Sequence, residues 1–117
     1  MELIYQLKLP FPPSVNGLYG GGSKQQRFKT ERYKKWCKNT GYIPPLNFDF
    51  PIHIEYTFIW PDARIRDGSN HIKCLGDLFV NAKLISDDNW KIIQSEEWNH
   101  KGIDKKNAGV EIKIFKI

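Results

Sequence analysis

The chain has 117 residues, of which 40% are hydrophobic and 14% aromatic. This content suffices for a folded domain with its own core and argues against intrinsic disorder. The net charge of +5 and the isoelectric point near 9.2 favour a polyanionic partner, although many small proteins carry such a charge without binding nucleic acid.

No apolar run approaches the ~20 residues that a transmembrane helix needs. The first ten residues alternate polar and apolar side chains and do not resemble a signal peptide. We therefore expect a cytoplasmic protein with no membrane partner. Cys37 and Cys74 lack the spacing of a metal or redox motif, so the sequence predicts two free thiols.

Residues 3–9 are predicted to form a strand with Leu3, Tyr5, Leu7 and Leu9 on one face. The prolines that follow end this strand. Residues 14–23 are rich in glycine and are predicted to form a loop; the phosphate-binding pattern is absent from it, so no nucleotide cofactor is expected. The sequence leaves open whether this loop contacts DNA or only connects two elements.

Thr30 is a suitable N-cap for a helix that extends to about Tyr42. Its less polar face holds Tyr33, Trp36, Cys37 and Thr40, and its other face is basic. The basic face either contacts phosphates or is simply solvated.

Alternating apolar residues predict a strand over residues 52–60. His53 should face outward from it, with no neighbours that would make it a ligand. A helix to Ala82 follows, with one apolar face (Ile72, Leu75, Leu78, Phe79 and Ala82) and an opposite polar arc (Asn70, Lys73, Asp77 and Asn81). His71 falls toward the apolar side, which favours a packed side chain over a metal ligand.

Residues 90–98 and 109–117 are predicted strands, joined by a polar turn over residues 100–107 into a hairpin. The order of elements predicts a single α+β domain over residues 1–117. Its sheet should be mixed or antiparallel, with both helices packed on one face.

Acidic residues flank the second helix, with Asp62 and Asp67 before it and Asp87 and Asp88 after it. They can meet if the chain folds back along the helix, and such hard oxygen ligands suit Mg²⁺ or Mn²⁺. The structural alternative is that Asp67 caps the helix and that the Asp-Asp-Asn run is an ordinary turn.

Two motifs stand out in the sequence. The first is Pro-Asp-x-Arg-x-Arg-Asp-x-x-Asn-x-x-Lys from Pro61 to Lys73, followed by Asp87-Asp88, and the second is Leu-Pro-Phe-Pro-Pro-Ser-Val-Asn at residues 9–16. Together they resemble the RusA family of Holliday-junction resolvases. The resemblance implies an Mg²⁺-dependent endonuclease for four-way DNA junctions, with Asp67 and Asp88 as metal ligands and Lys73 important for cleavage. It also implies a homodimer, in the cytoplasm of a bacterial or phage-infected cell.

Ser69 departs from the family pattern, which usually has a second catalytic aspartate there. A hydroxyl brings no charge to a hard cation. Asp87 or Asp77 could supply the missing charge, Ser69 could hold a metal-bound water, or the enzyme could be weak. The alternatives in function are a branched-DNA-binding protein without catalysis and a nuclease for another branched DNA.

The expected DNA contacts comprise two asparagines near the motifs and the basic residues of the upstream segment and of the first motif. They are Asn16, Lys24, Arg27, Lys29, Arg32, Lys34, Lys35, Arg64, Arg66 and Asn70. Phosphate contacts by such cations dominate DNA affinity.

Overall fold

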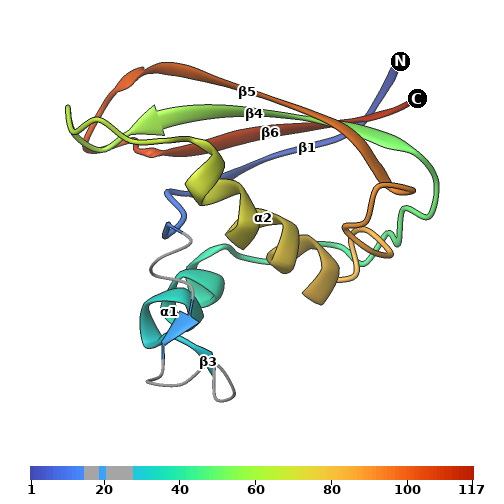
Figure 1. Cartoon of the computed structure of the whole chain (residues 1–117), viewed down its shortest axis with the longest axis horizontal. Helices are drawn as coiled ribbons and strands as arrows, with labels where there is room; N and C mark the ends of the chain where they lie inside the picture. Colours follow the sequence, from blue (N-terminus) through green and yellow to red (C-terminus); the bar gives the residue numbers. More distant parts are fainter. Residues whose placement is uncertain (15–18, 21–27) are drawn as a thin grey trace.

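The structure is a computed structural model and describes residues 1–14, 19–20 and 28–117. Its main sheet has four strands in the order β1-β6-β4-β5, which are β1 (Glu2–Pro10), β4 (Ile52–Trp60), β5 (Ile93–Ile103) and β6 (Gly109–Lys116). Short strands β2 (Tyr19–Gly20) and β3 (Phe28–Lys29) pair separately. Helices α1 (Glu31–Asn39) and α2 (Ser69–Asn81) lie on one side of the main sheet, with α2 nearest to it (Figure 1). The predicted α+β class is confirmed.

Strand β4 is the centre of the sheet. Ile52, Ile54, Tyr56 and Phe58 are completely buried in the core. The strand pairs with β6 in antiparallel and with β5 in parallel orientation. Because β4 and β5 are parallel, the chain needs a long crossover connection between them, and α2 is part of that connection.

The predicted hairpin of the last two strands is wrong, because β4 lies between β5 and β6. The reason lies in burial. Strand β4 is apolar enough to occupy the middle, whereas β5 is exposed at most of its residues and suits an edge. Strand β5 also begins at Ile93 instead of Trp90, which is 74% exposed.

The prediction that Leu3 shares one face of the strand with Tyr5, Leu7 and Leu9 is also wrong. An irregularity between Leu3 and Tyr5 shifts the pairing of β1 with β6. Leu3 is therefore exposed, while Ile4 packs against the core. One extra residue in a strand reverses which side chains face inward.

Helix α1 begins as predicted, since the Tyr33 backbone N–H donates to Thr30 Oγ1 at 3.2 Å. It ends at Asn39, earlier than expected, and Gly41 follows with a φ of 77°. Trp36 is buried, and its Nε1 donates to the Pro10 carbonyl oxygen at 2.9 Å. This bond joins α1 to the end of β1.

The two predicted faces of α2 are confirmed. Leu75 and Phe79 are fully buried, and Lys73 is exposed. His71 is packed as expected, with its ring 4.9 Å from that of Phe11 and its Nδ1 3.0 Å from the Pro12 carbonyl oxygen. Burial lowers the pKa of this imidazole.

His53 lies on the face of the sheet away from the helices, as predicted, but it is only 9% exposed. Glu55 and Glu97 lie beside it, so the expectation that it has no ligand-type neighbours is wrong. Sequence alternation gives the face of a strand but not which residues of the next strand lie alongside.

Three further observations concern the rest of the chain. Within the described residues, neither Cys37 nor Cys74 forms a disulfide bond, as predicted. No helix in the described part of the chain is long and apolar enough to cross a membrane. Most of the predicted loop over residues 14–23 lies outside the described residues, as do Asn16, Lys24 and Arg27.

Candidate functional site

Two carboxylates and one ammonium group meet on the polar side of α2. Lys73 Nζ lies 3.1 Å from Asp77 Oδ1 and 3.7 Å from Asp88 Oδ2. Asp88 also lies against Gly76, where an added Cβ would stand 3.7 Å from Oδ2. The segment after α2 therefore folds back onto the middle of the helix, as the prediction required. We call Lys73, Asp77 and Asp88 the α2 cluster.

Asp67 and Ser69 form a second pair at the start of α2. The backbone N–H and the hydroxyl of Ser69 both donate to Asp67 Oδ1, at 3.1 and 2.8 Å. Asp67 thus satisfies one of the free N–H groups of the helix terminus, although Gly68 occupies the N-cap position. Both side chains are exposed and present hard oxygen atoms to solvent.

Asp87 is directed into the turn that follows α2. Its Oδ1 accepts from the Asp88 backbone N–H at 2.7 Å, and its Oδ2 accepts from Asn89 Nδ2 at 3.0 Å. Asp77, in contrast, shares Lys73 with Asp88. Of the two residues that could replace the missing carboxylate, Asp77 is the one in the α2 cluster.

The donor set fits a hard divalent cation in its chemistry. Asp67, Asp77 and Asp88 offer carboxylate oxygens and Ser69 a hydroxyl oxygen, which are the ligand types of Mg²⁺. Within the described ranges, the aspartates do not bring three ligand atoms within 4.8 Å of one another. Asp67 stands at the start of α2 and Asp88 beside its middle, so the structure brings Asp88 and Lys73 together and leaves Asp67 with Ser69.

The two arginines of the motif differ in their surroundings. Arg66 binds Asp62 through two hydrogen bonds, at 2.7 and 3.0 Å, and lies over the Phe11 ring. These bonds lower the pKa of the Asp62 carboxyl. The Arg64 side chain is 80% exposed, with Nε 3.5 Å from Asp62. Arg66 thus holds the segment before α2 in place, while Arg64 extends into solvent.

A groove of about 690 Å³ is lined by Arg66 and Gly68, the residues on either side of Asp67 in the sequence. It lies between residues 60–68 and the second half of β5, and its lining includes Trp60, Arg64, Gly68, Trp98 and Ile103. Trp98 is 47% exposed. A Cβ on Gly68 would come within 2.8 Å of its ring, so glycine allows this contact. We call this feature the Trp98 groove.

The sequence did not predict this groove, because Trp98 was interpreted only as the last residue of the predicted strand over residues 90–98. The available signal was a single aromatic residue in an otherwise polar stretch, from Ser95 to Lys101. Tryptophan is enriched at binding surfaces, because it combines a large apolar ring with an N–H that can donate a hydrogen bond.

The basic residues of α1 form a second exposed surface. Arg32, Lys34 and Lys35 are all exposed. Lys34 Nζ also lies 3.5 Å from Glu31 Oε1. Asn70 is exposed next to Ser69. The side chain of Lys29 lies outside the described residues, so its expected DNA contact stays a prediction.

No family model matches the chain. Among curated proteins, the crossover junction endodeoxyribonuclease RusA of Aquifex aeolicus (strain VF5) is 33% identical over 116 residues. The match covers 95% of this chain and 88% of that protein. The chain belongs to the RusA family. Because the match extends over nearly the whole of both chains, it includes the strands of the sheet as well as the residues of α2. It confirms the resemblance drawn from the two motifs.

Proposed function

We propose that this RusA-family protein is an Mg²⁺-dependent endodeoxyribonuclease that cleaves four-way DNA junctions as a homodimer. The observation that carries the proposal is the similarity, over 95% of the chain, to a crossover junction endodeoxyribonuclease. The grouping of Lys73, Asp77 and Asp88 supports it, since phosphodiester cleavage needs both metal ligands and a group that stabilises negative charge.

Asp67 and Asp88 would hold Mg²⁺, with Mn²⁺ as a substitute, and Asp77 or a water on Ser69 would complete the set. These residues would hold the ion, whose chemistry there would be to activate a water molecule and to offset charge on the leaving oxygen. Lys73 would stabilise the negative charge that develops on the phosphate. Its two carboxylate neighbours hold the ammonium in position.

Branched DNA would lie across α1, the start of α2 and the Trp98 groove. Arg64 and the basic face of α1 would contact phosphates, which dominate affinity. Bases at a branch point lack one stacking neighbour, and an exposed tryptophan offers a surface on which a base can stack. The Trp98 ring lies against Gly68, next to Asp67, and so would place such a base close to the reacting phosphate.

A second candidate is a protein that binds branched DNA without cleaving it. Ser69 favours this alternative, because its hydroxyl donates to Asp67 and adds no charge for a cation. The two candidates differ in one observable, which is Mg²⁺-dependent nicking. Comparison of a four-way junction, a flap and a linear duplex separates a junction enzyme from a nuclease for another branched DNA.

The test compares Asp67→Asn and Asp88→Asn with wild type in nicking and gel-shift assays. Each change removes ligand charge but keeps the shape, so we expect nicking to disappear while junction binding persists. Glu2→Gln, at the exposed start of β1, the edge strand opposite β5, is the control and should nick normally. Wild-type nicking by either aspartate variant would remove that residue from the site.

A further inference from the structure

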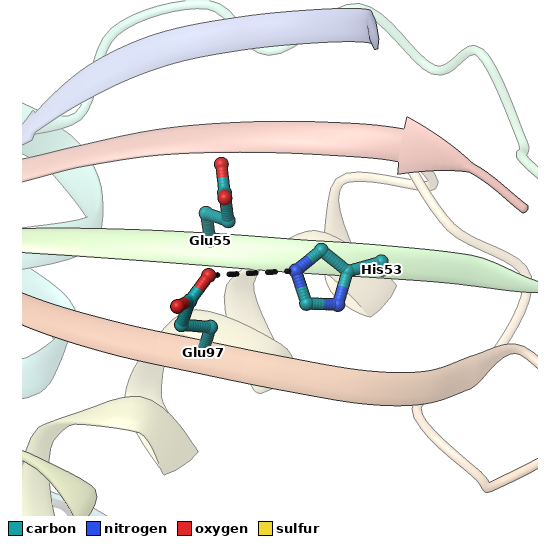
Figure 2. A group of neighbouring side chains, drawn as sticks. All are labelled: His53, Glu55 and Glu97. Atoms are coloured by element: carbon teal, nitrogen blue, oxygen red, sulfur yellow. Dashed lines mark ion pairs between the residues drawn. The ribbon is translucent and has the colours of Figure 1, made fainter. Parts of the chain in front are cut away.

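The face of the sheet away from the helices carries a second group of ligand-type side chains. His53 and Glu55 project from β4 and Glu97 from β5, and Figure 2 shows them together on one side of the sheet. One ligand atom of each residue lies within 4.8 Å of the others. Ile54 and Tyr56, which alternate with His53 and Glu55, face the core instead. The group is therefore separate from the α2 cluster.

The His53 ring is held in a fixed orientation. Its Nδ1 lies 2.6 Å from Ser95 Oγ, and its Nε2 faces Glu97 Oε2 at 3.9 Å, which is too long for a hydrogen bond. Nε2 has no other hydrogen-bond partner among the described residues. When Nδ1 donates to Ser95, Nε2 presents its lone pair toward the carboxylate. In metal-binding histidines, one ring nitrogen binds the metal and the N–H of the other nitrogen donates a hydrogen bond.

The two glutamates lie directly beside each other, because Glu55 pairs in register with Glu97 across β4 and β5. Like charges in such positions destabilise a sheet. Lys113 lies opposite Glu55 on β6, but in the described part of the chain it forms no ion pair with either glutamate. The group thus combines two carboxylates with an imidazole nitrogen, all of which are metal-ligand types.

We propose that His53, Glu55 and Glu97 form a binding site for a divalent transition-metal ion of the Zn²⁺ type. One imidazole and two carboxylates suit Zn²⁺, whereas Mg²⁺ prefers oxygen ligands alone. Tetrahedral Zn²⁺ with bonds near 2.1 Å places neighbouring ligand atoms about 3.4 Å apart. The 3.9 Å between Nε2 and Oε2 needs a small adjustment, and the Glu97 side chain, which is 55% exposed, is free to make it.

Such an ion links the edge strand β5 to the central strand β4. Most of β5 is exposed, so few apolar contacts hold it in place. An ion that binds only the folded state raises its stability in proportion to the logarithm of the free ion concentration. Trp98 follows Glu97 directly, so the same link fixes the strand that lines the Trp98 groove.

The test is calorimetric titration with Zn²⁺ in the presence of excess Mg²⁺, together with thermal unfolding with and without Zn²⁺. We expect one Zn²⁺ per chain and a higher unfolding midpoint. Ser95→Ala, which removes only the hydrogen bond to Nδ1, should weaken binding by about tenfold. His53→Gln and Glu97→Gln should weaken it further, while Asp88→Asn should bind Zn²⁺ as wild type does.

Two controls make the result specific. His100→Gln removes an exposed histidine of the same strand and should keep Zn²⁺ binding. Glu55→Gln is a second ligand variant at a partly exposed position, in case substitution of the buried His53 prevents folding, which circular dichroism would reveal. The proposal is overturned by absence of Zn²⁺ binding, by binding that survives in the folded ligand variants, or by its loss in Asp88→Asn.

Discussion

Ser69 is the residue at which this chain departs from its family's motif, and its contacts are with Asp67. Its backbone N–H and its hydroxyl both bind Asp67 Oδ1. The hydroxyl thus orients the carboxylate that we assign to the metal. Asp77 lies on the same side of α2 as Lys73 and Asp88, where it offers a further charge. These contacts favour a working site with one fewer carboxylate at the start of the helix.

Ser69→Asp should lower the Mg²⁺ concentration needed for half-maximal junction cleavage. The new carboxylate would stand beside Asp67, and the two like charges would repel each other until a cation binds between them. The measurement is a Mg²⁺ titration of cleavage for wild type and variant. Ser69→Asn is the control, because the asparagine side chain has nearly the shape of aspartate but no charge. A Ser69→Asp protein that needs as much metal as wild type, or more, would contradict an incomplete site.

At the scale of single elements, periodicity was a reliable guide where burial is one-sided. The stripe of α2 and the core face of β4 follow their 3.6- and 2-residue repeats, and both were predicted. Pairing was not predictable in the same way. Strands β5 and β6 are consecutive and separated by a short turn, yet β4 lies between them. The order of strands in a sheet depends on which strand is apolar enough to lie between two others. That comparison involves all the strands of the chain.

Helix α1 packs one face against the core and exposes its basic face. Its buried side carries Tyr33 and Trp36, and Lys34 and Lys35 face solvent. Lys34→Ala combined with Lys35→Ala should reduce the salt dependence of junction binding. Removal of one phosphate contact lowers the log–log slope by roughly 0.9. The measurement is junction affinity over a series of salt concentrations.

The control for this prediction removes the same charge from another face. Lys8→Ala combined with Lys113→Ala acts on the side of the sheet away from α1, because Leu9 and Ile112, their neighbours in sequence, are buried in the core. The slope of this variant should equal that of wild type. An equal slope in the Lys34 and Lys35 variant would mean that the face of α1 is only solvated.

At the scale of the whole molecule, the sequence indicates candidate site residues but not their full arrangement. The aspartates and Lys73 were identified from their spacing and from the family motif, and the return of the chain to α2 was expected. The structure then separated their environments, with Asp87 bound into a turn and Asp88 beside Lys73. Neither the Trp98 groove nor the His53 group could be found in the same way, because each joins β4 or its following loop to β5 through long-range pairing.

One subunit holds one α2 cluster, whereas separation of a four-way junction requires two cuts in strands related by symmetry. A two-fold homodimer provides two equivalent sites. Light scattering should therefore give twice the 13.7 kDa subunit mass at the concentrations used for cleavage. A stable monomer under those conditions would contradict the proposed assembly.

Mixing of active and inactive subunits tests whether that dimer is the cleaving unit. When wild type is mixed with a large excess of Asp88→Asn, nearly every active subunit pairs with an inactive one. A cruciform plasmid should then be nicked once and become an open circle, whereas the unmixed enzyme cuts both strands and gives a linear product. An unrelated protein in the same excess is the control and should leave the linear product unchanged. If active monomers cut independently, the linear product would persist in the mixture, and the two sites would not need to act together.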